Sequence, residues 1–333
     1  MRLTRRTLTS LAAPLAAVCL LAACGGSSGS GSTAAGSTGA PDIRIVMLLN
    51  DQFDPYYLTL VQGAEAEAEK QGVQFSWQAP TTLDVASQTQ LLQSVAATKP
   101  AGIIMSALDA NAMVAPMKAV QDSGIPIMTV DADVADPSAR LGTVRSNGTD
   151  TGALAAKAMN DLTGGSGKVG YIGYTPGIQS VDQRLAGWKQ GLTTYPGLAN
   201  AGEQYADAET ASNAAKTSAL ISKTPDLTSI FASWTNATIG AAQAVKQSGK
   251  AISVVGVDAS PDEVALLKSG AVSALVAQKP GEMGQTAVND LVAYVKNKTK
   301  PQSEKLLDSV VITQAQASDP EYTKYFYATP AKK

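Results

Sequence analysis

The sequence lacks histidine altogether, which excludes histidine-based catalytic triads, histidine metal sites and histidine acid–base chemistry. Its two cysteines, Cys19 and Cys24, both lie within the first 24 of 333 residues. The rest of the chain therefore cannot contain a disulfide scaffold, a cysteine nucleophile or a thiolate metal site. We expect a protein that requires neither a metal nor any other cofactor.

Charged residues are also few, at 16% of the chain, and 26 Lys and Arg against 28 Asp and Glu give a net charge of -2. This balance does not provide the basic surface that would hold nucleic acid phosphates, so we expect no nucleic acid partner. Hydrophobic residues make up 44% of the sequence, which is typical of a folded chain. The length suggests about two domains.

The N-terminal segment has the layout of an export signal. A basic start is followed by the apolar stretch Leu8–Leu21, which is too short to span a bilayer comfortably. The sequence LAAC at residues 21–24 resembles the lipobox of bacterial lipoproteins. We therefore predict a signal peptide at residues 1–23 and a lipid on Cys24. The general and twin-arginine export routes both stay open.

Residues 24–41 then read as a tether. The Gly/Ser-rich stretch GGSSGSGSTAAGSTGA at residues 25–40 behaves as flexible coil and would reach roughly 20–24 Å on average. The protein is thus expected to be exported and held by its lipid at the outer face of the plasma membrane, or in the periplasm. Which membrane carries the anchor is open.

From residue 42 onward, short apolar runs alternate with segments of helical periodicity. We predict strands at 43–49, 73–78, 102–107, 125–130, 169–174, 230–234 and 253–257. We predict helices at 55–71, 84–98, 110–123, 148–163, 178–194, 210–223, 236–248 and 282–297. Asp54 and Pro55 suit the start of the first helix, and Gly72 suits its end.

This alternation predicts an α/β fold with parallel sheets buried on both faces. These βα units are too many for one small sheet. We therefore expect two doubly wound lobes with a cleft between them. In such sheets ligands bind beyond the carboxyl ends of the strands. The polar residues that follow the strands are therefore the candidates for a binding site.

Several short motifs occur in a characteristic order: DPYY at 54–57, GIPI at 124–127 leading to Asp131, Arg184 before GW at 187–188, VVGVD at 254–258, and AQ at 277–278. In these motifs, residues 43–313 resemble the type I periplasmic sugar-binding proteins, the ribose- and galactose-binding kind that feed ABC importers. The resemblance implies two lobes joined by three crossovers. Lobe 1 would comprise 42–145 plus 279–307, and lobe 2 would comprise 146–278 plus 308–333.

The resemblance also implies a function. The protein would be a monomeric, non-enzymatic binder that captures a small sugar or polyol by lobe closure and delivers it to ABC permease subunits. Hydroxyl-binding residues would be Asp54, Asp131, Asp258 and Gln278, and Tyr56 and Tyr57 would cover the sugar ring. The further candidate ligand-binding residues are Asn147, Asp182, Arg184 and Trp234.

The sequence departs from the ribose binders at several of these positions. Ala132 and Asp182 stand where that pattern has arginine, Ala208 replaces an aromatic residue, and Trp234 replaces an asparagine. The cleft thereby becomes rich in acids, which disfavours an anionic ligand. A neutral sugar, a polyol or an amino-substituted ligand is expected. Whether Arg145 or Arg184 enters the cleft is open.

Other functional classes fit less well. The chain shows no catalytic constellation, and the glycines at 164–167 precede a strand, so they do not form a phosphate-binding loop. A transcription regulator would need a DNA-binding head before residue 42, where the export signal lies. Two alternatives stay open: a component that presents its ligand to a membrane receptor, and a binder of a non-carbohydrate solute.

Overall fold

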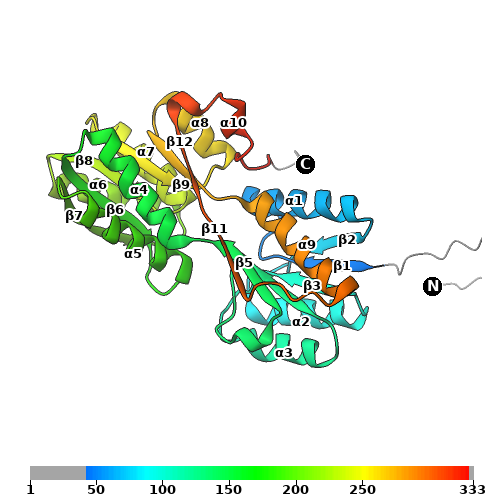
Figure 1. Ribbon diagram of the computed structural model, residues 1–333. Coiled ribbons are helices and arrows are strands. Elements are labelled where there is room, and N and C mark those ends of the chain that lie inside the picture. Colours follow the sequence, from blue (N-terminus) through cyan, green and yellow to red (C-terminus); the bar gives the residue numbers. More distant parts are fainter. Residues whose placement is uncertain (1–42, 330–333) are drawn as a thin grey trace, which may run out of the picture. The chain divides into compact units, whose positions relative to one another are not determined.

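The structure of the protein is a computed structural model that describes residues 43–329 (Figure 1). These residues belong to a compact unit that spans Pro41–Lys333. The predicted signal peptide, Cys24 and tether lie outside the described residues. Among the helices of 43–329, none combines the length and the apolar character needed to cross a bilayer.

Two six-stranded sheets form the framework. The first sheet is parallel throughout, in the order β11 (Glu304–Leu307), β5 (Gly142–Ser146), β4 (Ile127–Val130), β3 (Gly102–Met105), β1 (Arg44–Leu48), β2 (Gln74–Gln78). The second has the order β12 (Val310–Thr313), β10 (Ala274–Ala277), β9 (Ser253–Val257), β8 (Leu227–Ala232), β6 (Gly167–Tyr174), β7 (Leu198–Ala206). Only β12 in this second sheet runs antiparallel to its neighbour.

Helices cover both faces of each sheet. The first sheet is flanked by α1 (Pro55–Gln71), α2 (Val85–Ala97), α3 (Val114–Asp122) and α9 (Pro280–Asn297). The second is flanked by α4 (Gly148–Thr163), α5 (Gln179–Thr194), α6 (Thr210–Lys223), α7 (Thr235–Ser248) and α8 (Pro261–Ser269). The short helix α10 (Pro320–Thr323) follows the last strand.

Alternation along the strands explains this layering. In β1, Ile45 and Met47 pack into the same apolar cluster as Leu60 of α1. Their neighbours Val46 and Leu48 point to the other face and join the cluster formed with α2 and α3. From Ile45 to Leu48 the strand is apolar at every position and is buried on both sides, as a parallel sheet requires.

The chain passes between the two sheets three times within residues 43–329. It crosses from β5 to α4, from β10 to α9, and from β11 to β12. The predicted fold class, two doubly wound lobes joined by three crossovers, is confirmed.

The first helix begins and ends where the sequence predicts. The Asp54 side chain accepts a hydrogen bond from the backbone N–H of Tyr56 at 2.9 Å, and Pro55 is the first helical residue. Gly72 ends the helix with a left-handed φ of 65°. Because Asp54 caps this helix, the residues of its first turn are held at the carboxyl end of β1.

Candidate ligand-binding site

A cluster of hydroxyl groups surrounds Asp131 at the carboxyl end of β4. Its carboxylate accepts hydrogen bonds from the hydroxyls of Tyr56 at 3.0 Å, Tyr57 at 2.9 Å and Ser106 at 3.3 Å. Asp131 itself has a φ of 65°, a region that non-glycine residues rarely adopt. The tyrosines come from α1 and Ser106 directly follows β3, so side chains from two elements converge on the carboxylate that follows β4.

Two amides fix the orientation of this cluster. The Asn50 amide group donates to Tyr57 Oη and Ser106 Oγ, both at 3.1 Å. Gln88, which is fully buried, donates to Asn50 Oδ1 at 2.9 Å and so sets which way the Asn50 amide faces. The hydroxyls that reach Asp131 are therefore preorganised by a second layer of hydrogen bonds.

The electrostatics of the first cluster keep its hydroxyls protonated. Burial, together with the negative charge of Asp131, raises the pKa of Tyr56 and of Tyr57 well above the ordinary value. Burial also raises the pKa of Asp131, although the tyrosine hydroxyls and the positive charge of Arg184 act in the opposite direction. The tyrosines thus remain hydrogen-bond donors.

A second cluster surrounds Asp258, which follows β9 and is 9% exposed. Its Oδ1 accepts from Gln278 Nε2 at 2.6 Å and from the hydroxyl of Tyr327 at 2.9 Å. Its Oδ2 accepts from Thr235 Oγ1 at 3.4 Å. Like Asp131, Asp258 has a positive φ, of 87°.

Glu263 lies behind this second cluster and is fully buried. Its Oε2 accepts from Ser260 N at 3.1 Å, from Ser260 Oγ at 2.8 Å and from Thr235 Oγ1 at 3.3 Å, while Oε1 has no partner among the described residues. Burial and the nearby negative charge of Asp258 raise the pKa of Glu263 to about 8. The group is therefore largely protonated at neutral pH.

A cavity of about 310 Å³ lies between elements of the two lobes. Asp54 and Pro55 of the first lobe line this cavity. The other residues that line the cavity are Trp234, Thr235, Asn236, Asp258, Ser260 and Tyr327. Although Asp54 is exposed as a whole, partial desolvation of its carboxyl group, with the charges of Asp258, Asp51 and Asp131, raises its pKa to about 6. The cavity is bordered by acids and aromatic rings.

Two buried nitrogen atoms of the predicted site residues lack partners among the described residues. Trp234 Nε1 is one of them, and the rings of Trp234 and Tyr174 form a T-shaped pair with centroids 5.4 Å apart. The other is Nε of Arg184, whose Nη1 donates to the carbonyl of Ser233 at 2.7 Å. Buried donors without partners are costly, so both are suited to binding a ligand acceptor.

The structure thus brings eight of the ten predicted residues into one region. Asp54, Trp234 and Asp258 line the cavity, and Gln278 binds Asp258. The Tyr56 ring meets Tyr327, which lines the same cavity, at 5.7 Å. The hydroxyls of Tyr56 and Tyr57 both donate hydrogen bonds to Asp131, which links these three residues. The positive charge of Arg184 acts on Asp131.

Asn147 and Asp182 lie elsewhere. Asn147 caps α4 by accepting from Asp150 N at 3.1 Å, and it donates to Asp308 at 3.3 Å. Asp182 is exposed and accepts from Gly177 N at 3.0 Å. Neither residue lines the 310 Å³ cavity.

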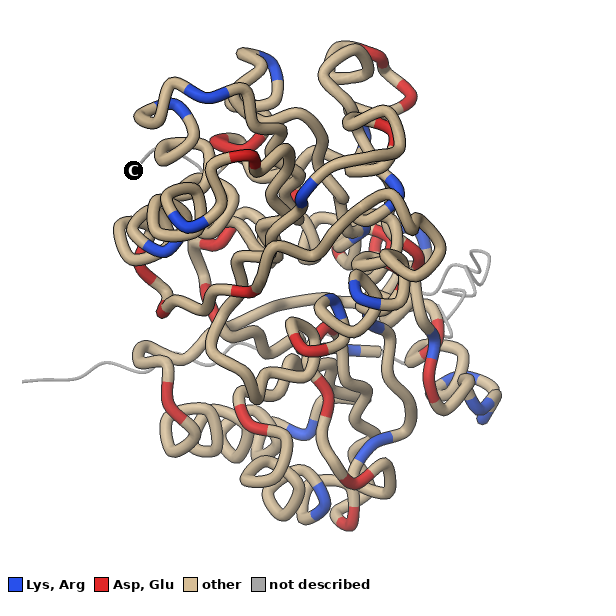
Figure 2. The backbone as a smooth tube through the Cα atoms, turned by 90° about the vertical axis from the view of Figure 1, so that its left-hand side faces the viewer, with Lys and Arg blue, Asp and Glu red and all other residues tan. Residues whose placement is uncertain are grey.

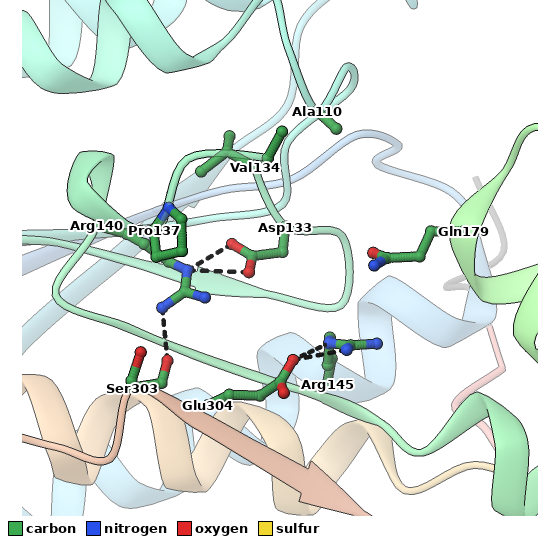
Figure 3. A pocket seen from close by; sticks show the side chains of 10 residues that line it. Ala110, Asp133, Val134, Pro137, Arg140, Arg145, Gln179, Ser303 and Glu304 are labelled. Atoms are coloured by element: carbon green, nitrogen blue, oxygen red, sulfur yellow. Dashed lines mark hydrogen bonds and ion pairs between the residues drawn. The ribbon is translucent and has the colours of Figure 1, made fainter.

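Arg145 lines a different and larger cavity of about 500 Å³ (Figure 3). There it forms an ion pair with Glu304 at 2.6 Å, and Arg140 pairs with Asp133 at 2.7 Å. Figure 3 shows both guanidinium groups engaged by these carboxylates. Because its charges are already satisfied, this cavity is a weaker candidate than the one beside Asp258.

Some residues of the site are not among the ten predicted ligand contacts. Asn50 and Ser106 belong to the polar residues at the ends of predicted strands, so topology gives a signal for them. Tyr327 lies 14 residues beyond the end of β12, and no periodicity there indicated that it returns to the site.

Charged residues of both signs occur throughout the described part of the chain. Figure 2 shows Lys and Arg interspersed with Asp and Glu over both lobes in that view. Among residues 43–329, no three His, Cys, Asp or Glu side chains gather as a metal site would require.

Comparison with known proteins adds an independent observation. A family model described as a periplasmic binding protein domain matches residues 45–299. The ribose import binding protein of Bacillus subtilis is 25% identical over 242 residues, covering 72% of this chain and 78% of that protein. The D-allose-binding periplasmic protein of Escherichia coli is 25% identical over 283 residues, covering 80% and 91%.

Solved structures resemble the fold closely. An ABC transporter solute-binding protein from Agrobacterium vitis, bound with α-D-tagatopyranose, has a TM-score of 0.78 and 29% identity, covering 86% of this chain and 99% of that one. The arabinose-binding protein AraP from Geobacillus stearothermophilus has a TM-score of 0.79 and 25% identity, covering 86% and 100%.

Proposed function

The chain belongs to the family of periplasmic binding protein domains, and from this membership we propose that it captures a small sugar or polyol outside the cytoplasm and delivers it to an ABC importer. Its relatives bear the names of ribose and allose binders, and a solved neighbour holds a tagatose. The protein works by binding and carries out no reaction on its ligand.

The observation that carries this proposal is the pair of carboxylates, Asp131 and Asp258, one in each lobe. Each is oriented by at least one tyrosine hydroxyl. Carboxylate oxygens accept hydrogen bonds from hydroxyl groups, and a sugar presents several hydroxyls at fixed spacing. Trp234 and Tyr327 add aromatic surface for the apolar face of a ring.

Charge selects the class of sugar. The negative charges of Asp131 and Asp258 act on Asp54, and the positive charge of the buried Arg184 acts on Asp131. A phosphate or carboxylate on the ligand would add repulsion to a site already rich in acids. The arrangement favours a neutral polyhydroxylated ligand.

Closure of the lobes couples binding to a change of shape. A ligand that bonds to Asp131 and to Asp258 at once interacts more strongly when the two lobes approach each other. It thereby stabilises the closed state by the difference in its interaction free energy with the two states. The closed form is what the importer would receive.

We assign the ligand contacts to eight residues of the site: Asp54, Tyr56, Tyr57, Asp131, Arg184, Trp234, Asp258 and Gln278. Asn147 and Asp182 are left out of this assignment because their polar atoms bind backbone groups and Asp308 away from the cavity. The lobes are divided as 42–145 plus 279–307 and 146–278 plus 308–333.

The N-terminal segment completes the proposal. A lipid on Cys24 and the tether at 24–41 hold a monomeric binding unit near the permease. Metabolic labelling with an alkyne fatty acid tests this: the chain should take up label, and Cys24→Ala should take up none. Equal labelling of both proteins would contradict the anchor.

A thermal-shift screen tests the ligand class. The panel comprises D-ribose, D-allose, D-arabinose, D-tagatose, neutral polyols, amino sugars and sugar acids. A ligand at about 1,000 times its Kd stabilises the folded state by roughly 4 kcal/mol, which raises Tm by several degrees. We expect shifts from neutral sugars or polyols. A shift from sugar acids alone, or from nothing in the panel, would contradict the proposal.

A further inference from the structure

The chain continues beyond β12 with residues 314–329, which lie outside the segment matched by the family model. They include a short 3-10 turn at Gln314–Gln316 and the helix α10, drawn in red next to α8 in Figure 1. Gln314 Nε2 donates to the carbonyl of Lys268 at the end of α8 at 3.3 Å. This C-terminal segment is therefore seated on the second lobe.

Aromatic residues hold the segment in place. Tyr322, Tyr325 and Phe326 are half-buried and pack against the main apolar cluster. The Lys268 ammonium lies 5.7 Å from the centre of the Phe326 ring. The burial of several rings gives a 16-residue segment enough apolar contact to be ordered without a strand or a long helix.

Tyr327 is the point at which this segment enters the binding site. Only 5% of it is exposed, and its hydroxyl donates to Asp258 Oδ1 at 2.9 Å. Its ring meets Tyr56 of the first lobe at 5.7 Å, with an angle of 75° between the planes. It also lines the 310 Å³ cavity, so it contacts both lobes and the space between them.

The backbone around Tyr327 bonds to both lobes as well. Tyr327 N donates to the carbonyl of Ala259 at 3.0 Å, next to Asp258. The following amide, Ala328 N, donates to Thr59 Oγ1 of α1 at 2.6 Å. The Thr59 hydroxyl in turn donates to the Pro55 carbonyl at 2.7 Å, so both its hydrogen-bonding roles are used.

From these contacts we propose that residues 326–329 form a strap between the lobes, and that Tyr327 is a specificity-determining residue of the sugar site. The strap is fixed to the second lobe at Ala259 and to the first at Thr59. Tyr327 positions the Asp258 carboxylate through its hydroxyl group. Its ring limits the size of the 310 Å³ cavity on the side that it lines. This inference rests on the proposed function for its second part, the role in specificity.

Hydrogen exchange followed by mass spectrometry tests the strap without any sugar. The amides of Tyr327 and Ala328 should be protected in the wild type. Thr59→Val removes the acceptor of the Ala328 amide, and exchange of peptides covering 326–329 should rise about ten-fold. Thr193→Val is the matched control, because Thr193 makes the same kind of bond to a helix carbonyl, 2.7 Å to Gln190, far from the strap.

The strap would be refuted by unprotected amides at 326–329 in the wild type. It would equally be refuted if Thr59→Val left their exchange unchanged.

Titration with D-ribose and D-allose as probes tests the role in specificity, since allose carries one more hydroxymethyl group than ribose. Tyr327→Ala enlarges the cavity and should raise the ratio of allose to ribose affinity about ten-fold. Tyr327→Phe keeps the ring but leaves Asp258 without one donor, and should weaken both sugars about ten-fold with the ratio unchanged. Tyr322→Phe, in the same segment but away from the cavity, should change neither quantity.

If Tyr327 had only a structural role, Tyr327→Ala and Tyr327→Phe would both lower Tm and leave the ratio of allose to ribose affinity unchanged. This result would overturn the specificity role. If Tyr327→Ala fails to fold, unchanged affinities in Tyr327→Phe would overturn it instead. A wild type that binds neither ribose nor allose would overturn the specificity role for these two sugars, whereas the proposed function would still be decided by the wider thermal-shift panel. The hydrogen-exchange result would still decide the strap.

Discussion

Asp131 and Asp258 occupy matching positions in the two lobes. Each follows a central parallel strand directly, each has a positive φ, 65° and 87°, and each carboxylate accepts a hydrogen bond from a tyrosine hydroxyl. A non-glycine residue in this backbone region costs on the order of 1 kcal/mol or more. Glycine would adopt the same backbone without strain, so the presence of two carboxylates at these turns points to a role in binding.

Among the residues of the second lobe, Asp258 should contribute most to the affinity for the sugar. Asp258→Ala removes the acceptor shared by Gln278 and Tyr327 and should weaken binding of a neutral sugar by more than ten-fold. Titration calorimetry measures this directly. Asp226→Asn, an exposed site paired with Lys168, serves as the control. An unchanged Kd for the sugar in Asp258→Ala would contradict the assignment of Asp258 to the binding site.

Trp234 should report on binding. It lines the cavity and has a buried Nε1 without a partner, so a bound sugar should change the tryptophan fluorescence. Trp234→Phe should abolish most of that change and weaken binding by several-fold. Trp77→Phe, in the edge strand β2, should retain it. A full fluorescence response in Trp234→Phe would contradict the assignment.

The stability of the protein should fall as pH rises from 6.5 to 8. The pKa of Glu263 is about 8 in the folded state against an ordinary value of 4.5, so the folded protein holds a proton that the unfolded chain releases. The unfolding free energy then decreases with pH, by up to about 1.4 kcal/mol per unit. Without histidine, few other side chains titrate in this range.

Glu263→Gln keeps the shape of the side chain and its bonds to Ser260, but it cannot release a proton. Urea unfolding at pH 6.5 and 8 should therefore show a flatter pH dependence in this variant than in the wild type. Glu282→Gln, which is exposed on α9, should behave like the wild type. Equal slopes in Glu263→Gln and wild type would place the titrating group elsewhere.

Close packing of α1 on α9 gives a matched pair of stability predictions. A Cβ at Gly63 would lie 2.0 Å from the Gly281 carbonyl oxygen, whereas a Cβ at Gly281 would have its nearest neighbour at 3.8 Å. Gly63→Ala should therefore lower the unfolding free energy by about 1–3 kcal/mol. Gly281→Ala should be neutral or stabilising by up to about 1 kcal/mol. Similar effects of the two substitutions would contradict this packing.

Helix bounds could be predicted well where the sequence carries capping residues, as at 55–71 and 148–163. The helix at 210–223 also has the predicted limits, although no side chain caps its start. The helix predicted at 110–123 begins only at Val114. The Asp109 carboxylate accepts from the amides of Asn111 and Ala112, and this local turn takes the place of the first helical turn.

Several elements lacked a sequence signal for physical reasons. The edge strands β7 and β11 are only partly buried, so they need no continuous apolar run. The short helix α8 depends on a capping box between Ser260 and Glu263 rather than on long periodicity. In the site, residues directly after strands could be anticipated from topology, whereas Tyr327 comes from a segment whose path is set by tertiary packing of its aromatic rings.

A neutral sugar that binds between Asp131 and Asp258 should need both carboxylates. This can be measured by titration calorimetry of the wild type, Asp131→Asn and Asp258→Asn with D-ribose, D-allose, D-arabinose and D-tagatose. We expect at least one of these sugars to bind with a stoichiometry of one per chain, and each substitution to weaken its binding at least about ten-fold. Binding that is unaffected by both substitutions, or a wild type that takes none of the four, would contradict this expectation.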